Sequence, residues 1–337
     1  MRKLLIISND IEQAGVERNP HTFRPEHLEK LKAAAAGSEV EVVVASPNDA
    51  PAHYASAEIV ASFPARMPDI ALLPQAKWLH SFSAGVDRIL TPQVAASDIV
   101  LSNSRGVHAT PIAEHIIAFM LVFTRGMQQT FHNQQKHLWQ KAHSLGELRD
   151  QVVLIVGMGE IGTEAARLAH AFGARVFAIS RSQKEKRDFV EKTGLQKDLD
   201  VLLPEADFVV ITLPHTQETH HLFDTKKFAL MKRSAVIINI GRGGIVNEID
   251  LIDALNKKVI AGAGLDVTEQ EPLHQDSPLW DMEQVVITPH HSGLSHKYMD
   301  RAIDLLCKNL TAYLAGDPST ELRARKLPTE VDKTLGY

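Results

Sequence analysis

Three residues that suit proton and hydride chemistry lie in separate segments of the second half of the chain. Arg242 stands in NIGRGGIVNE, Glu271 in GLDVTEQEP and His290 in ITPHHSG, and each segment begins with or follows an apolar, β-branched run. An arginine can bind a carboxylate and polarise a neighbouring carbonyl. A histidine can donate a proton when a carboxylate fixes its tautomer. Together they suit the reduction of a 2-oxo acid, in which a proton reaches the carbonyl oxygen as hydride reaches the carbon.

Each of these residues also has a purely structural interpretation. Arg242 could be a surface-loop arginine, Glu271 an ordinary exposed acid and His290 a helix-capping residue. Any one of the 17 histidines is more often structural than catalytic. Parallel strands, however, end at the same edge of a sheet, so residues that follow successive strands meet in one crevice. The combination, rather than any single residue, carries the catalytic hypothesis.

A glycine pattern precedes these segments. The run VLIVGMGEIG places Gly157, Gly159 and Gly162 directly after an apolar stretch and at the start of a predicted helix. In a dinucleotide site the first glycine permits a tight turn, the second lets the backbone approach a pyrophosphate, and the third lets helix and strand pack closely. The amides of Glu160 and Ile161 would then face the phosphates at the positive end of the helix. A plain glycine-rich turn is the alternative, but the strand–turn–helix context favours a dinucleotide.

The segment FAISRS, at the end of the next predicted strand, departs from the usual dinucleotide pattern. An acid there would accept hydrogen bonds from the ribose 2′-hydroxyl, whereas Arg181 has only donors. A guanidinium between Ser180 and Ser182 suits a 2′-phosphate, which it can bind in a bidentate manner. We therefore expect NADP(H) to be favoured, with NAD(H) as the alternative. The competing interpretation is a solvated loop arginine beside the charged run KEKR.

The segments that hold these residues are best explained as buried parallel strands of an α/β fold, because helical stretches separate most of them. From Gln151 onward the expected strands are QVVLIVG, ARVFAIS, ADFVVITLP, AVIINIG, VIAGAGLDV and QVVITP. In the first 104 residues the expected strands are KLLII, VEVVVAS, 57–62, 70–73, 78–82 and 99–102. Helices are predicted over PEHLEKLKAAAA, 108–127 and 295–314, and a polar stretch covers 128–143.

Length, charge and cysteine content exclude several classes of protein. A chain of 337 residues is long for one core, so two domains are expected. The 36 Lys and Arg against 41 Asp and Glu leave a formal charge of -5 and no basic stripe for nucleic acid. The single Cys307 excludes an internal disulfide and suits a reducing compartment. The apolar runs at 4–7 and 112–124 are too short for a signal peptide or a membrane span. We expect a cytoplasmic protein without nucleic-acid, membrane or metal partners.

The order and spacing of four motifs resemble those of the D-isomer-specific 2-hydroxyacid dehydrogenase family, which includes glyoxylate/hydroxypyruvate reductases and D-3-phosphoglycerate dehydrogenase. The motifs are GMGEIG, INIGRGGIVNE, GLDVTEQEP and TPHHSG, and the resemblance covers nearly the whole chain. It implies that Arg242 binds the substrate and polarises its carbonyl, and that Glu271 pairs with the catalytic histidine. That histidine directly follows a proline in the family, so His290 rather than His291 would be the proton donor.

The resemblance implies further contacts with substrate and cofactor. Asp266 matches the position that contacts the nicotinamide end of the cofactor. The segment HSFSAGVD resembles a loop whose backbone amides hold the substrate carboxylate, which implicates Ser83, Ala84 and Gly85. Without the resemblance, a strand–helix turn with glycine at positive φ explains this loop equally well. Further cofactor contacts are implied at Pro214, Ile240, Gly241, Ser292 and Gly293.

The family fold implies two doubly wound parallel-sheet domains, a Rossmann cofactor domain inserted into a discontinuous flavodoxin-like substrate domain. Residues 1–104 and 294–337 would form the substrate domain and residues 105–293 the dinucleotide-binding domain, with hinge closure excluding water. The resemblance also implies a homodimer through the cofactor domain. The 128–143 arm would wrap a partner, with Trp139 matching a family tryptophan. An exposed polar helix is the alternative interpretation of this arm.

The choice of substrate and two other function classes stay open. The chain ends without the regulatory domain of many phosphoglycerate dehydrogenases, so we expect a glyoxylate/hydroxypyruvate reductase type or a broader 2-oxo-acid reductase. A nucleotide-sensing protein of the corepressor type shares the fold and the catalytic residues, although long disordered flanks are missing here. A methyltransferase or a hydrolase of adenosyl compounds could use the glycine pattern, but Arg242, Glu271 and His290 have no evident role there. His215 departs from the family pattern and is expected on the adenosine side.

Overall fold

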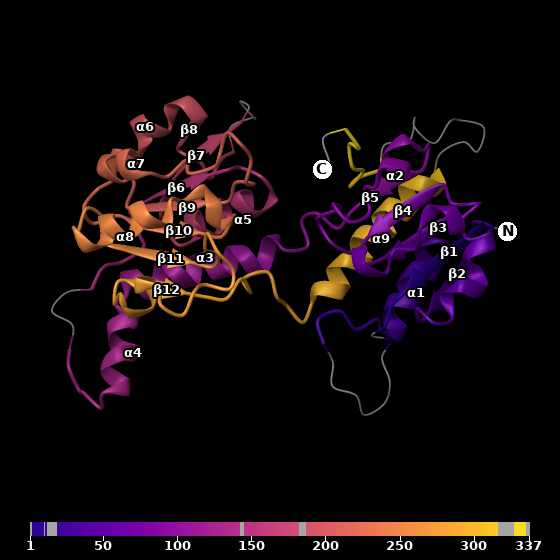
Figure 1. Ribbon diagram of the computed structural model, residues 1–337, viewed down its shortest axis with the longest axis horizontal. Coiled ribbons are helices and arrows are strands. Elements are labelled where there is room, and N and C mark those ends of the chain that lie inside the picture. Colours follow the sequence, from indigo (N-terminus) through magenta and orange to yellow (C-terminus); the bar gives the residue numbers. More distant parts are fainter. Residues whose placement is uncertain are drawn as a thin grey trace. The chain divides into compact units, whose positions relative to one another are not determined.

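Two compact units make up the chain (Figure 1). The computed structural model describes residues 2–9, 11, 19–141, 145–181, 187–315 and 327–334. Met1–Val107 together with Leu294–Tyr337 form the first unit, and His108–Gly293 form the second. The assignment of substrate to the first unit and of cofactor to the second stays a prediction.

The first unit is built on a five-stranded sheet in which all paired strands are parallel. Its order, β2-β1-β3-β4-β5, is that of the flavodoxin-like doubly wound fold. The strands are β1 (Arg2–Ile7), β2 (Val40–Ala45), β3 (Ile59–Ser62), β4 (Trp78–Ser81) and β5 (Val100–Ser102). The helices are α1 (Pro25–Ala34), α2 (Pro92–Ala96) and α9 (Tyr298–Ala315).

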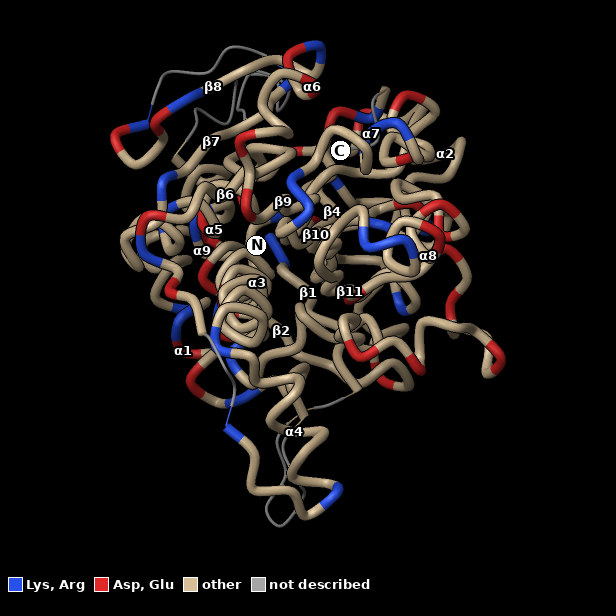
Figure 2. The backbone as a smooth tube through the Cα atoms, turned by 90° about the vertical axis from the view of Figure 1, so that its left-hand side faces the viewer, with Lys and Arg blue, Asp and Glu red and all other residues tan. Residues whose placement is uncertain are grey.

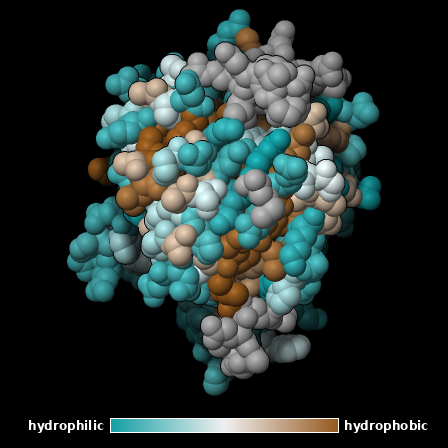
Figure 3. All heavy atoms as spheres, turned by 90° about the vertical axis from the view of Figure 1, so that its right-hand side faces the viewer, coloured by the Kyte–Doolittle hydropathy of each residue, from teal (hydrophilic) through white to brown (hydrophobic). Residues whose placement is uncertain are grey.

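The first unit has a hydrophobic core on each face of its sheet, as covered parallel strands require. Along β1, Leu4 and Ile6 belong to one core, which includes Trp78 and side chains of α9. Leu5 and Ile7 belong to the other core, because successive strand residues point to opposite faces. Helix α9 lies beside α1, so a helix from the C-terminal segment completes the unit that β1 begins. In Figure 3, hydrophilic residues cover much of the visible surface, with hydrophobic residues in patches between them.

The second unit holds a seven-stranded sheet, and its described pairings are also parallel. The order β12-β11-β10-β9-β6-β7-β8 reverses between β6 and β9, which is the switch point where Rossmann folds bind ligands. The strands are β6 (Val152–Val156), β7 (Arg175–Ser180), β8 (Lys192–Leu195), β9 (Phe208–Ile211), β10 (Val236–Asn239), β11 (Gly262–Leu265) and β12 (Val285–Ile287). The helices are α3 (Ala109–Thr124), α4 (Met127–Gln135), α5 (Glu160–Ala171), α6 (Leu199–Leu202), α7 (Thr225–Leu230) and α8 (Glu248–Asn256).

Close packing explains the glycines of β11. A β-carbon at Gly264 would lie 3.0 Å from the Phe119 ring, and one at Gly262 would lie 3.0 Å from the Phe123 ring. Both rings belong to α3, which therefore packs directly on the backbone of β11.

Basic and acidic positions are interspersed along the traced backbone (Figure 2). The predicted fold class, two doubly wound parallel-sheet domains, is confirmed.

Local details differ from the sequence predictions. The predicted strand at 70–73 is wrong: Ile70–Leu72 form a 3₁₀ turn, because Asp69 accepts a hydrogen bond from the amide of Ala71 at 2.9 Å. Strand β8 was not predicted at all. The helix expected over 108–127 ends at Thr124, since Gly126 adopts a left-handed φ of 58° and α4 begins after it. None of the helices among the described residues is long and apolar enough to cross a membrane.

Candidate active site

The glycine loop lies between β6 and α5, and its three glycines have different surroundings. Gly157 has a φ of 115°, which strongly favours glycine. A β-carbon at Gly162 would lie 1.9 Å from the carbonyl oxygen of Gly157, so α5 packs against the turn. At Gly159, by contrast, no described atom lies within 4 Å of the corresponding position. Gly157 and Gly162 therefore allow the tight turn and the close packing of α5 on it, whereas the position beside Gly159 is open.

An open position beside the backbone of a glycine, at the start of a helix, is what the approach of a pyrophosphate requires. Gly159 is the N-cap of α5, so Glu160, Ile161 and Gly162 form the first turn of the helix and present its positive end. Glu160 is exposed, and it does not block the loop with a buried side chain. The residues present therefore suit the group that the fold implies, and their contacts with it stay a prediction.

The end of β7 lies next to the glycine loop. The amide of Gly157 donates to the carbonyl oxygen of Ile179 at 2.9 Å, and β7 ends one residue later at Ser180. Arg181 follows directly and is exposed. Ser182 lies outside the described residues. The structure thus puts an arginine where the chain leaves the strand that neighbours the loop.

The predicted pair of His290 and Glu271 is in direct contact through its side chains. Nδ1 of His290 lies 2.7 Å from Oε2 of Glu271, and the two side chains are 50% and 37% exposed. A hydrogen bond at Nδ1 selects the tautomer and directs Nε2 away from Glu271. The geometry suits a histidine that exchanges a proton with a ligand while its ring is held by the acid.

The turn that carries His290 has an unusual backbone conformation. His290 has a φ of 50°, a left-handed conformation that few non-glycine residues adopt, although histidine does so more often than most, and that costs about 1–3 kcal/mol. Its amide donates to the carbonyl oxygen of Asp266 at 2.8 Å, immediately after β11. The turn between β12 and the end of the unit is therefore anchored to the end of the neighbouring strand.

Asp266 is buried and accepts hydrogen bonds on both carboxylate oxygens. Oδ1 accepts from Thr288 Oγ1 at 2.6 Å and from the amide of His291 at 3.1 Å, and Oδ2 accepts from the hydroxyl of Ser292. Burial acts to raise the pKa of the Asp266 carboxyl, but the hydrogen bonds from Ser292, Thr288 and the His291 amide outweigh it, and that pKa is lowered. Asp266 is thus a buried carboxylate that holds the turn of residues 290–292.

Arg242 lies in a loop that the chain packs tightly after β10. The side chain of Asn239 accepts from the amide of Gly241 at 3.1 Å and donates to the carbonyl oxygen of Arg242 at 3.1 Å. A β-carbon at Gly243 would lie 1.8 Å from the carbonyl oxygen of Thr268. The Arg242 loop therefore lies directly against the segment that leads to Glu271. Arg242 itself is exposed, and its Nη1 donates to its neighbour's carbonyl oxygen at 2.7 Å.

The segments after β9 and β10 also lie against each other. A β-carbon at Gly241 would lie 2.6 Å from the carbonyl oxygen of Leu213, the residue before Pro214. Ile240 and Gly241 are buried, whereas Pro214 is exposed. His215, the next residue, bonds to His220 at 3.0 Å between ring nitrogens. The placement of His215 on the adenosine side of a cofactor stays a prediction.

The predicted substrate loop belongs to the first unit and follows β4. Asn103 donates to the carbonyl oxygen of Ala84 at 2.6 Å, and the amide of Ser104 donates to that of Ser83 at 3.2 Å. Tyr298, at the start of α9, donates from its hydroxyl to the carbonyl oxygen of Phe82. Neighbouring segments thus hold the carbonyl groups of this loop. Gly85, at its end, is exposed.

Sequence reasoning missed the residues that support these loops. Asn103 and Tyr298 do not belong to the motifs that identify the site, and Thr288, which opens the motif TPHHSG, was given no role there. The partners of these residues are distant in the chain. Tyr298 and Phe82, for example, are 216 residues apart. One signal was available for Asn103 and Ser104: both directly follow a predicted strand, as active-site residues of parallel sheets do.

Comparison with known proteins identifies the family. A sequence model described as "D-isomer specific 2-hydroxyacid dehydrogenase, NAD binding domain" matches residues 117–292. The glyoxylate reductase of Korarchaeum cryptofilum is 33% identical over 250 residues, which cover 72% of this chain and 75% of that protein.

Solved structures agree along the whole chain. A D-isomer specific 2-hydroxyacid dehydrogenase family protein from Aeromonas salmonicida superposes with a TM-score of 0.77 and 31% identity, covering 98% of this chain and 99% of that one. The NADPH-dependent glyoxylate/hydroxypyruvate reductase of Sinorhizobium meliloti, solved with NADP and sulfate, gives a TM-score of 0.72 and 29% identity, covering 100% of both chains. This chain therefore belongs to the D-isomer-specific 2-hydroxyacid dehydrogenase family, whose members are NAD(P)-dependent oxidoreductases.

Proposed function

We propose that this protein reduces a small 2-oxo acid, of the glyoxylate or hydroxypyruvate type, to the D-2-hydroxy acid with NADPH. The observation that carries the proposal is the His290–Glu271 pair at 2.7 Å, held beside the tightly packed Arg242 loop. The names of the Korarchaeum cryptofilum and Sinorhizobium meliloti relatives support the substrate class.

In the proposed mechanism, the reduced nicotinamide supplies the hydride, and the residues of the chain manage the charge and the proton. Arg242 binds the substrate carboxylate and polarises the 2-oxo group through its guanidinium. His290 donates the proton from Nε2 to the oxygen that becomes the hydroxyl, because Nδ1 is bonded to Glu271. Glu271 keeps the ring in this orientation through its hydrogen bond to Nδ1. The backbone amides of Ser83, Ala84 and Gly85 are proposed to bind the carboxylate.

Cofactor choice is assigned to the end of β7. Ser180 and Arg181 would hold a 2′-phosphate, and the NADP complex of the Sinorhizobium meliloti relative supports this choice. The variant Arg181→Asp replaces the donor by an acceptor for the ribose hydroxyls, so the ratio of kcat/KM for NADPH to that for NADH should fall at least about tenfold. An unchanged ratio would make Arg181 a solvated surface residue. Lys257→Asp, a charge reversal on the exposed end of α8, serves as the matched control.

A substrate panel tests the function itself. NADPH or NADH oxidation is followed at 340 nm with glyoxylate, hydroxypyruvate, phenylpyruvate and 2-oxoisocaproate, and the product is resolved on a chiral column. The proposal predicts turnover of the smaller acids and a D-configured product from hydroxypyruvate. Cofactor binding without turnover of any 2-oxo acid would contradict it and favour the nucleotide-sensing alternative.

Dimer formation through the second unit is also proposed. Helix α4 and the residues after it expose large apolar side chains: Phe131 and Leu138 are each 50% exposed and Trp139 is 97% exposed. Large apolar side chains that are exposed to solvent are enriched in protein interfaces. Light scattering should give twice the mass of the chain, and Trp139→Ser with Leu138→Ser should shift the equilibrium towards monomer. A monomeric parent protein would contradict the proposal.

A further inference from the structure

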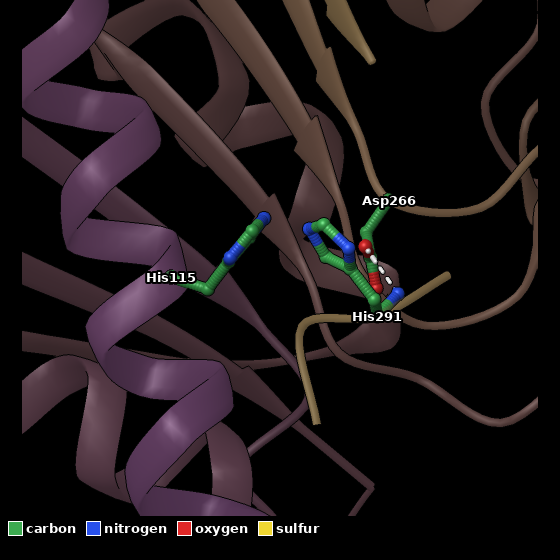
Figure 4. Close-up of side chains that lie close together, drawn as sticks. All are labelled: His115, Asp266 and His291. Atoms are coloured by element: carbon green, nitrogen blue, oxygen red, sulfur yellow. Dashed lines mark hydrogen bonds between the residues drawn. The ribbon is translucent and has the colours of Figure 1, made fainter. Parts of the chain in front are cut away.

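Three side chains gather where the turn of His290 meets helix α3. Figure 4 shows His115 projecting from α3 towards the ring of His291, with Asp266 on the other side of that ring. Their potential ligand atoms all lie within 4.8 Å of one another. The rings of His115 and His291 meet edge to face at 5.7 Å. His291 directly follows His290, the predicted proton donor, so the contacts of this cluster affect how His290 is held.

A hydrogen-bonded chain runs through this cluster. Nε2 of His115 lies 3.0 Å from Oγ1 of Thr288, and the same hydroxyl donates to Oδ1 of Asp266 at 2.6 Å. A hydroxyl has only one proton, so Thr288 must accept from His115 and donate to Asp266. His115 is therefore protonated on Nε2. Burial lowers the pKa of His115, with the His291 ring also lowering and Asp266 raising it, and the lowered value favours the neutral ring.

The chain continues from Asp266 into the His290 turn. The amides of His291 and Ser292 donate to the Asp266 carboxylate at 3.1 and 3.2 Å, and the Ser292 hydroxyl donates to it as well. These bonds fix the two residues that follow His290, whose own φ is 50°. A backbone in that conformation persists only where its surroundings over-determine it. The carboxylate supplies that constraint.

The same bonds argue against a metal ion in the cluster. Oδ1 of Asp266 accepts from Thr288 and His291, and Oδ2 accepts from both the amide and the hydroxyl of Ser292. Nε2 of His115 already donates to Thr288. A metal would have to displace these bonds and release the turn, whereas the hydrogen-bonded arrangement satisfies both oxygens of the buried Asp266 carboxylate.

We propose that His115 is a positioning residue that acts through Thr288 and Asp266 on the turn that carries His290. Its role is to orient the Thr288 hydroxyl towards Asp266, so that the carboxylate stays in place and the turn keeps the His290 ring against Glu271. The inference rests on the proposed function for its kinetic consequence but not for its structural one.

Paired substitutions test each link. Thr288→Val removes the hydroxyl and keeps the shape, whereas Thr288→Ser keeps the hydroxyl. His115→Leu removes the donor, whereas His115→Gln offers an amide N–H close to the position of Nε2. His170→Leu, on the exposed side of α5, controls for the loss of a histidine. Each variant is assayed for kcat with glyoxylate and hydroxypyruvate, for the NADPH Kd, for thermal stability and for amide hydrogen exchange at 291 and 292.

The expected result separates turnover from binding. Thr288→Val and His115→Leu should lower kcat about tenfold, because small displacements of a catalytic group are costly, while the NADPH Kd stays within about twofold. Thr288→Ser and His115→Gln should restore most of kcat. The double variant should be no slower than Thr288→Val alone, since both changes break one chain. Exchange at 291 and 292 should accelerate in the two damaged variants only.

Several results would overturn the inference. The first is a Thr288→Val variant whose kcat and exchange rates at 291 and 292 equal those of the parent. The second is a double variant in which the two losses of kcat multiply. The third is an NADPH Kd that rises in the damaged variants as much as kcat falls, which would make Asp266 chiefly a cofactor ligand. If His115→Leu does not fold, the Thr288 pair tests the link to Asp266, and slow turnover with accelerated exchange at 291 and 292 in His115→Gln overturns the role of His115. If the parent protein reduces no 2-oxo acid, the proposed function fails, and the exchange rates at 291 and 292 still test the hydrogen-bonded chain.

Discussion

The approach of the Arg242 loop to the segment before Glu271 gives the sharpest structural prediction. At Gly243 a β-carbon would lie 1.8 Å from the carbonyl oxygen of Thr268 and 2.6 Å from the amide nitrogen of Glu269. Both neighbours are backbone atoms, which cannot turn aside as a side chain could. The substitution Gly243→Ala must therefore push the two segments apart, and these segments carry Arg242 and Glu271.

The size of the effect follows from that distance. Real β-carbons essentially never approach other atoms within 3.0 Å, so the segments must separate by at least about 1 Å. A displacement of this size between catalytic groups costs about 100-fold in rate, or about 3 kcal/mol of transition-state stabilisation. We expect kcat/KM of Gly243→Ala with glyoxylate or hydroxypyruvate to fall by about that factor.

The assay compares Gly243→Ala with Gly37→Ala by steady-state oxidation of NADPH, fluorescence titration of the cofactor and thermal unfolding. Gly37 has a φ of 78° in the first unit, and no described atom lies within 4 Å of its absent β-carbon. Its substitution should cost about 1 kcal/mol of stability and leave kcat unchanged. If Gly243→Ala keeps kcat/KM within about threefold of the parent, the packing of the two loops does not position the catalytic groups, and the reasoning fails.

Three further predictions concern stability and binding. His80 is fully buried, and burial lowers the pKa of its ring to about 3. In the unfolded chain the same ring has a pKa near 6.5, so the unfolded state takes up the proton first as the pH falls. About 5 kcal/mol of folding stability should therefore be lost between about pH 6.5 and about pH 3. Urea unfolding at several pH values should show this slope, and His80→Gln should flatten it. Gly162→Ala should lower the melting temperature, because its β-carbon would lie 1.9 Å from the carbonyl oxygen of Gly157. Gly159→Ala should keep the parental melting temperature and weaken NADPH binding. The reverse pattern would contradict the assignment of the glycine loop to the pyrophosphate. Tyr298→Phe removes the donor to the Phe82 carbonyl oxygen, so the KM for the 2-oxo acid should rise about fivefold, and an unchanged KM would exclude that role.

The overall fold was predictable because its signals are local. Buried parallel strands are continuous apolar runs, and the glycine fingerprint is a strand, a turn and a helix within a few residues. Strand β8 has no such signal: its sequence is KTGL, and its pairing with β7 places it. Lys192 lies over the Phe177 ring at 4.6 Å and forms an ion pair with Glu205 at 2.6 Å. Only the folded neighbours explain that strand.

The candidate site divides in the same way. The pairing of Glu271 with His290 was expected from motifs and the structure contains it at 2.7 Å, although the catalytic roles themselves stay predictions. The links from Thr288 to His115 and from Phe82 to Tyr298 were not expected, because they join residues 173 and 216 positions apart. Polar side chains on helices that face a turn give no local pattern. Their partners are set by how α3 and α9 pack, which periodicity alone does not determine.

Single-turnover reduction of glyoxylate and hydroxypyruvate by His290→Asn loaded with NADPH, beside the parent protein, tests whether His290 donates the proton. A general acid contributes about 10²–10⁴-fold to such a step. We predict that the rate of nicotinamide oxidation falls by about 10³-fold while the NADPH Kd and the melting temperature stay close to those of the parent. A variant that oxidises NADPH at the parental rate would contradict the assignment of His290 as the proton donor.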